Sequence, residues 1–139
     1  MPMNRKDLQS LADERLGDAK VLLASNRYGG AYYLIGYAVE CGLKACIAKL
    51  TQAEDFYDKN LAKKIFQHDL EQLANHARLS AAIEQSGKAD PLFEANWAQV
   101  ILWSEESRYE THIRAEAEQM MQAVENPDHG VMQCIKRYW

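Results

Sequence analysis

Glu40 and Lys44 lie one helical turn apart in the segment Ala31–Lys49, which is otherwise almost entirely apolar. A helix that is apolar on nearly every side belongs inside a bundle, so we expect Glu40 to be at least partly buried. A buried carboxylate without a cation and hydrogen-bond donors takes up a proton and becomes neutral. The sequence therefore predicts a partner for Glu40, elsewhere in the chain or in a second copy of it. At about 100° per residue, one narrow stripe of this helix carries Tyr33, Gly36, Tyr37, Glu40, Lys44 and Ile47.

Arg108 is the first candidate for this partner, because a guanidinium can bind a carboxylate through two N–H groups and still offer others to a phosphate. The alternative is a structural ion pair between Arg108 and Glu40 that only fixes the register of two helices. Lys44 has two interpretations as well. It either forms an ordinary i,i+4 ion pair with Glu40 or joins Arg108 in binding a phosphate.

Two histidines are candidates for proton transfer, because imidazole titrates near neutral pH. His68 immediately precedes a short helix that begins at Asp69, where it either borders a polar groove or bonds a backbone carbonyl as an ordinary loop residue. His112 is predicted at the start of a later helix. Tyr33 and Tyr37 could offer hydroxyl groups or a stacking face to a base, or they are core residues with solvated tips.

The composition limits the classes of protein to consider. The chain has 139 residues with a net charge of −4, which argues against a nucleic-acid footprint spread over the whole surface and leaves a local basic pocket open. Cys41, Cys46 and Cys134 form no CxxC pair, and they indicate reduced core residues of a cytoplasmic protein. We expect no membrane span, because Glu40 and Lys44 interrupt the long apolar run. The spacings match no metal site and no phosphate-binding loop, so the sequence implies neither a metal nor a cofactor.

Helical periodicity predicts a single all-α bundle in one domain, residues 1–139. The segment 25–30 is predicted as a break, 86–88 as a second break, and 51–66 as a variable loop or irregular helix. Asp69 and Asp90 are predicted N-caps, the latter with Pro91 in the first turn. The expected helices are about 4–25, 31–49, a short helix from Asp69, 92–103, 111–125, and a last helix whose cap and first turn are Asn126–Pro127.

The chain resembles the HEPN family (the nucleotide-binding domain of higher eukaryotes and prokaryotes). The resemblance is carried in order by RYGGAYYLIGYAVECGLKACI, HDLEQLA and a late tryptophan-containing segment that ends in SRYE. It implies an up-and-down bundle of four to five main helices plus short ones, usually a homodimer with a polar groove at its interface. That groove would contain Glu40, Lys44, Arg108, His68 and Tyr37.

The family includes metal-independent ribonucleases, proteins that accompany small nucleotidyltransferases, and nucleotide-binding proteins without catalysis. Its catalytic members carry an arginine followed by a histidine after a longer spacer than the three residues between Arg108 and His112. We therefore favour a nucleotide- or RNA-associated accessory protein of a prokaryotic toxin–antitoxin or defence-type pair, with a nucleotidyltransferase partner. The alternatives are a metal-independent endoribonuclease toxin that uses Arg108 with His112 or His68, and a non-catalytic helical interaction module. Enzymatic activity stays open, and the short spacer favours its absence.

Overall fold

The computed structural model describes residues 4–54 and 66–139. Within these two ranges the chain forms seven α-helices, one 3-10 helix and no β-strand, which confirms the predicted all-α bundle. The segment 51–66 lies mostly outside the described residues, and its first four residues continue the second helix. The elements are α1 (Arg5–Ala24), α2 (Tyr28–Glu54), α4 (Leu70–His76), α5 (Ser80–Ala89), α6 (Pro91–Val100), η1 (Glu105–Tyr109), α7 (Arg114–Glu125) and α8 (Val131–Lys136).

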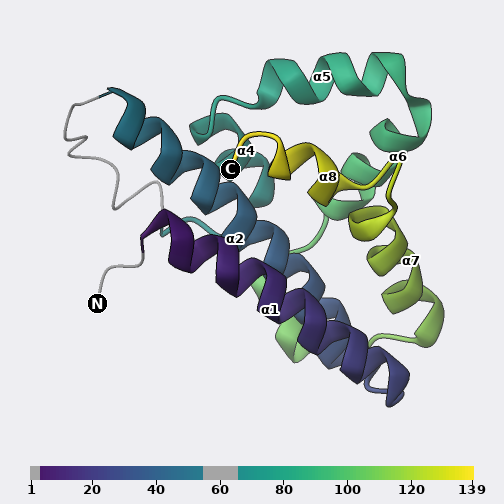
Figure 1. The fold of residues 1–139 in the computed structure, drawn as a ribbon. Helices are drawn as coiled ribbons and strands as arrows, with labels where there is room; N and C mark the ends of the chain where they lie inside the picture. The colour runs from purple at the N-terminus through teal and green to yellow at the C-terminus, as the bar shows by residue number, and fades with distance from the viewer. Residues whose placement is uncertain (1–3, 55–65) are drawn as a thin grey trace.

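α1 and α2 form a long antiparallel hairpin, and the other helices pack around it (Figure 1). α1 begins with a capping box, in which Asn4 Oδ1 accepts the Asp7 amide at 2.8 Å and Asp7 Oδ2 accepts the Asn4 amide at 3.2 Å. The predicted break at 25–30 is too long, because α2 already starts at Tyr28. Asn26 alone turns the chain, with a left-handed φ of 62°, and neither glycine that follows needs a positive φ.

α2 is the central helix and contacts α1, α4, η1, α7 and α8. Most of its apolar positions are buried, as the periodicity predicts; Ile35, Val39 and Leu43 have no exposed surface, whereas Leu34 is partly buried. Gly42 allows α8 to approach α2, since a Cβ there would lie 3.1 Å from the Ile135 side chain. The other core residues include Leu70, Leu73, Phe93, Val100, Met120, Val124, Val131 and Ile135. No helix in the described ranges is both long and apolar enough to cross a membrane.

The three cysteines are buried free thiols, as predicted. Desolvation by burial raises the pKa of Cys41 to about 11 and that of Cys46 to about 12. Both groups therefore stay protonated at neutral pH and act as small apolar side chains.

The predicted break at 86–88 is wrong. These residues belong to α5, in which Gly87 is buried. A Cβ at this position would lie 3.3 Å from the Cβ of Glu94 in α6. The glycine therefore permits close helix packing, while the real turn lies earlier, where Arg78 has a φ of 60°. Leu92, in the first turn of α6, is 59% exposed.

The last helices also begin later than predicted. α7 starts at Arg114 rather than Thr111, and Ile113, directly before it, is 62% exposed. Asn126 does not open a helix, because its Oδ1 accepts the amides of Asp128 and His129 at 2.9 Å and forms a turn before α8.

Asp90 joins two distant parts of the chain. One carboxylate oxygen caps α6 by accepting the Leu92 amide at 3.1 Å, and the other lies 2.6 Å from Nδ1 of His129. The hydrogen bond to His129 is the largest of the effects that lower the pKa of Asp90.

We expect this pair to make stability depend on pH in the acid range. The unfolded chain takes up the Asp90 proton near the ordinary pH of about 4, whereas the folded state takes it up only at lower pH. The contribution of the pair is therefore present above about pH 4 and is lost as the pH falls through the depressed folded pKa. Asp90→Asn keeps a capping oxygen but cannot ionise, so its melting temperature should fall less on acidification than that of the wild type.

Circular dichroism melts at about pH 6 and about pH 3 test this expectation. The matched control is Asp128→Asn, which removes a nearby carboxylate that forms no ion pair within residues 4–54 and 66–139. Equal acid dependence in Asp90→Asn and the wild type would contradict it.

Candidate functional site

The carboxylate of Glu40 is buried in the middle of α2 and has only 1% of its side-chain surface exposed, as the sequence predicted. Lys44, one turn along the helix, donates to Glu40 Oε2 at 2.9 Å and is itself only 12% exposed. This geometry matches the i,i+4 interpretation of Lys44, although the pair is buried rather than solvated. Both charges are therefore removed from water and depend on each other.

His68 supplies the second partner of Glu40. It lies in the segment that precedes α4, whose N-cap Asp69 accepts the Gln72 amide at 3.0 Å as predicted. The Nδ1 atom of His68 lies 3.1 Å from Glu40 Oε1, and Nε2 lies 3.2 Å from Glu105 Oε2 in η1. We call Glu40, Lys44, His68 and Glu105 the Glu40 network. The two predicted alternatives for His68, a position bordering a polar groove and a bond to a backbone carbonyl, did not include this bridge between two carboxylates.

The expected pairing of Arg108 with Glu40 is wrong. In the described part of the chain, Arg108 contacts Tyr109 and Tyr33, and its guanidinium carbon lies 4.8 Å from the centroid of the Tyr109 ring. Interaction with Tyr109, and more weakly with Tyr33, raises the pKa of Arg108, which stays a cation. The physical reason is that η1 presents Glu105 to the inner network and Arg108 to the aromatic side chains.

Tyr33 and Tyr37 lie on the same stripe as Glu40, as predicted, and both are half-buried. Their rings lie 6.2 Å apart, and Tyr33 also stacks on Trp103 at a centroid distance of 5.9 Å. Burial, followed by the neighbouring Cys41, raises the pKa of Tyr37 to about 12. Tyr37 therefore acts as a neutral phenol that can donate a hydrogen bond but cannot serve as a base near neutral pH.

Trp103 packs against α2 beside Tyr33. It is 3% exposed, and its ring covers Gly36 so closely that a Cβ there would lie 2.3 Å from three ring atoms. The indole Nε1 atom is buried and has no hydrogen-bond partner among the described residues. Gly36 thus permits close packing of α2 against the turn after α6.

A groove of about 490 Å³ opens beside the Glu40 network. Its walls carry His68 and Trp103, together with the 77% exposed ring of Phe66. Carboxylates dominate its polar lining, since Asp69, Glu105 and Glu106 all contribute to it. The acidic lining of this groove therefore disfavours a bound phosphate.

His112 is not part of this region. Its side chain is 5% exposed and stacks on Tyr32 with ring centroids 3.9 Å apart. Nδ1 contacts Glu116 at 3.2 Å, while Nε2 lies 3.6 Å from a Glu110 oxygen and is buried with no hydrogen-bond partner among the residues that the structure describes. Bonds from the Ile113 amide and then from His112 lower the pKa of Glu116. A buried ring of this kind cannot reach a substrate in the observed conformation.

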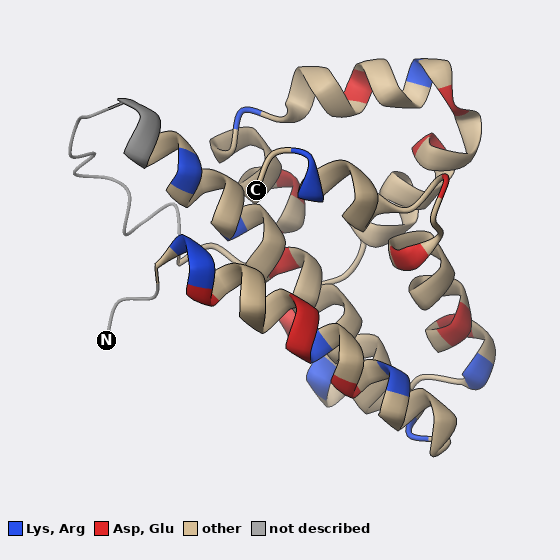
Figure 2. Ribbon diagram, viewed as in Figure 1, with Lys and Arg blue, Asp and Glu red and all other residues tan. Residues whose placement is uncertain are grey.

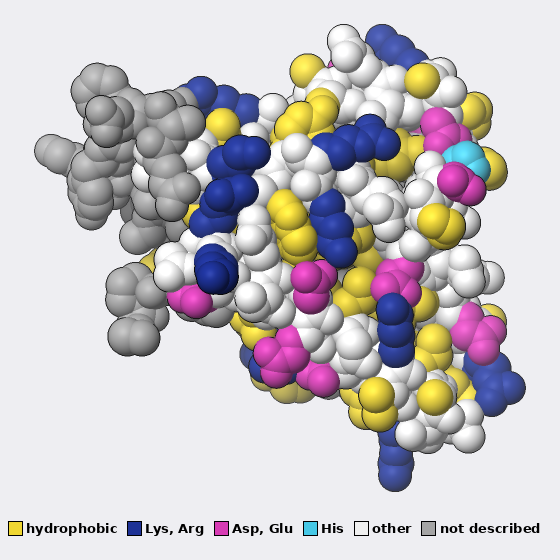
Figure 3. Space-filling model, in the orientation of Figure 1, with side chains coloured by type: hydrophobic (Ala, Val, Ile, Leu, Met, Phe, Trp, Pro, Cys, Tyr) yellow, Lys and Arg dark blue, Asp and Glu magenta, His cyan; other side chains and the backbone are white. Residues whose placement is uncertain are grey.

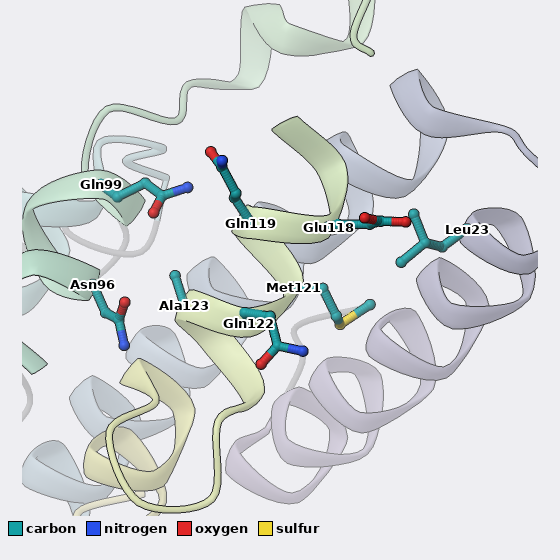
Figure 4. A pocket seen from close by; sticks show the side chains of 8 residues that line it. All are labelled: Leu23, Asn96, Gln99, Glu118, Gln119, Met121, Gln122 and Ala123. Atoms are coloured by element: carbon teal, nitrogen blue, oxygen red, sulfur yellow. The ribbon is translucent and has the colours of Figure 1, made fainter. Parts of the chain in front are cut away.

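The larger cavity near α7 contains none of the predicted site residues. Its volume is about 510 Å³, and it lies between α1, α6 and α7 (Figure 4). Carboxamides face it from both α6 and α7, and it has no cation in its lining. No group of three or more His, Cys, Asp or Glu side chains within the described ranges is arranged to hold a metal ion.

Charges of both signs are distributed along the helices (Figure 2). On the face shown in Figure 3, Lys and Arg side chains are interspersed with Asp and Glu. That face therefore has no broad cationic surface, which is consistent with the net charge of −4.

Sequence reasoning missed Glu105 and Trp103 as site residues. The sequence indicated that the buried Glu40 needs partners. No periodicity or motif, however, identified Glu105 as a member of the Glu40 network. Trp103 was predicted as an ordinary apolar helix residue. No protein-family model matches this chain, and neither the curated proteins nor the solved structures contain a significant match to it.

Proposed function

We propose that this protein is a HEPN-like accessory protein that binds nucleotides or RNA, in a prokaryotic toxin–antitoxin or defence-type pair with a nucleotidyltransferase. The observation that carries the proposal is the exposed Arg108–Tyr109 pair beside Tyr33. The Tyr109 ring is 77% exposed and the guanidinium lies over it. An aromatic face next to a permanent cation suits a base and its phosphate.

The acidic groove limits how such a ligand can lie. Asp69, Glu105 and Glu106 repel phosphate from one side of η1, whereas Arg108 attracts it on the other. A bound nucleotide would therefore place its phosphate at Arg108 and its base against Tyr109 or Tyr33. Lys44 is not the second phosphate ligand in this arrangement, because its ammonium group is already hydrogen-bonded to Glu40.

The homodimer is part of the same proposal. Three large apolar side chains around η1 are strongly exposed. Scattered exposed apolar residues are ordinary, whereas several near one element are typical of a protein–protein interface. They are Phe66 at 77%, Leu102 at 80% and Tyr109 at 77%. A nucleotidyltransferase partner rests on the family resemblance alone.

A direct test uses labelled single-stranded RNA in the presence of EDTA. We expect the wild type to bind the RNA without cleaving it, and Arg108→Ala to weaken binding about tenfold, because one charge-assisted contact is lost. The matched control is Arg114→Ala, since the Arg114 guanidinium carbon lies 5.5 Å from the centroid of the Tyr28 ring, a similar cation–aromatic pair at another place. Equal binding by wild type and Arg108→Ala would contradict the assignment.

An endoribonuclease is the second candidate, because His68 is 44% exposed and the buried Glu40 orients its ring. In such an enzyme His68 would accept the 2′-hydroxyl proton while Arg108 stabilised the charge on the phosphate. Cleavage in EDTA that is lost in both Arg108→Ala and His68→Ala, but kept in His112→Ala, would establish it. Neither binding nor cleavage would leave a helical interaction module.

A further inference from the structure

Both ring nitrogens of His68 contact carboxylates, at 3.1 Å for Glu40 and 3.2 Å for Glu105. Ionised carboxylates only accept hydrogen bonds, and a neutral imidazole has a single N–H. The ring can therefore donate to both partners only as the imidazolium. When one proton leaves, one nitrogen faces a carboxylate oxygen as a second acceptor, and that contact becomes repulsive.

The two contacts are not equivalent. Glu40 is 1% exposed, so water cannot replace the contact that its carboxylate makes with His68. The Glu105 side chain is 42% exposed and can turn to solvent. The remaining proton should therefore stay on Nδ1, toward Glu40, and the bridge should open on the Glu105 side. The element that would be released is η1.

η1 is short and is held by a few hydrogen bonds of its own, among them the Ser104 side-chain cap on the Glu106 amide, and by its contacts with α2. It is a five-residue 3-10 helix, closed by the Ser107 amide to Ser104 at 3.0 Å and the Glu110 amide to Ser107 at 3.1 Å. Short helices of this type depend on tertiary contacts. The side chains of Arg108 and Tyr109 extend from the same turn, so their positions depend on how η1 is anchored.

We propose that His68 is a proton-dependent bridge that fastens η1 to α2 and thereby controls the placement of Arg108 and Tyr109. Among the described residues, the charged groups around His68 are Glu40 and Lys44 of α2, Glu105 and Glu106 of η1, and Asp69 of its own segment. Lys44 is committed to Glu40, so the surroundings of the ring are acidic on the η1 side.

The first measurement is the nitrogen NMR spectrum of the His68 ring from about pH 5.5 to about pH 8.5. We expect both nitrogens to be protonated at the lower pH and the Nδ1–H tautomer to predominate at the higher pH. A predominant Nε2–H tautomer at high pH would overturn the proposal, because the proton would then be on the Glu105 side.

The second measurement is hydrogen exchange of the η1 amides, corrected for the intrinsic pH dependence. In the wild type we expect protection to fall about two- to fivefold at the higher pH, the size of one partly exposed ion pair. Glu105→Gln should abolish this difference, because an amide can accept from the imidazolium and donate to the neutral ring. Glu106→Gln, which removes a neighbouring carboxylate that does not contact His68, should behave like the wild type.

Identical protection at both pH values in the wild type would overturn the proposal, as would a pH response that persists in Glu105→Gln. Neither measurement uses a ligand. The bridge can therefore fail while nucleotide binding at Arg108 stands, and the reverse result can be recognised as well.

Discussion

Glu40→Ala should lower the free energy of unfolding by about 3–5 kcal/mol, the usual effect of removing one partner of a buried ion pair. Lys44 is 12% exposed and would lose the carboxylate that accepts its hydrogen bond at 2.9 Å. His68 would lose its inner partner as well. Urea denaturation followed by circular dichroism measures the difference, provided that the variant retains its helical signal.

A double variant distinguishes the electrostatic contribution of the Glu40–Lys44 pair from the contribution of side-chain packing at the same positions. Glu40→Leu combined with Lys44→Met replaces both charges by apolar groups of similar size, and we expect its stability to lie within about 1–2 kcal/mol of the wild type or above it. The control Glu105→Ala removes the exposed carboxylate of the same network and should cost about 1 kcal/mol or less. If Glu40→Ala were no more destabilising than Glu105→Ala, the buried pair would not be a significant structural contact.

Gly36→Ala should destabilise the protein by about 1–3 kcal/mol, although alanine is the better helix former. The new methyl group would lie 2.3 Å from atoms of the Trp103 ring, which is buried and cannot move freely. Chemical denaturation gives the change in stability, and near-ultraviolet circular dichroism should show an altered tryptophan environment.

The matched substitution is Gly17→Ala in α1. Gly17 is an exposed helix residue, and a Cβ there meets no atom within 4 Å. We expect this variant to be more stable than the wild type by about 0.5–1 kcal/mol. A stabilising effect of Gly36→Ala of the same size would mean that Trp103 does not press on α2 as the structure describes.

The sequence predicted well what depends on neighbouring residues. The apolar periodicity of Ala31–Lys49 was sufficient to predict a buried helix and a buried Glu40, and the side chains of Asp69 and Asp90 were recognised as N-caps. It failed for Gly87, because a glycine inside a helix and a glycine in a turn look alike until the approach of α6 is known.

The partners in the site could not be predicted in the same way. The sequence favoured Arg108 as the cation for Glu40, whereas the packing of η1 against α2 places Arg108 beside Tyr109 and Tyr33 and leaves His68 as the partner. His112 was a plausible proton-transfer group until its stacking on Tyr32 placed it in the interior.

The sequence by itself determined an all-α bundle, its central helix, and the burial of one carboxylate that required partners. The i,i+4 spacing already offered Lys44 as one partner, and the tertiary structure alone decided that His68 is the other and that Glu105 lies on the outer side of His68. The physical reason is one of range. Periodicity and capping are set by residues within a turn or two of each other, whereas a hydrogen bond between distant segments depends on ångström-scale packing of the whole bundle.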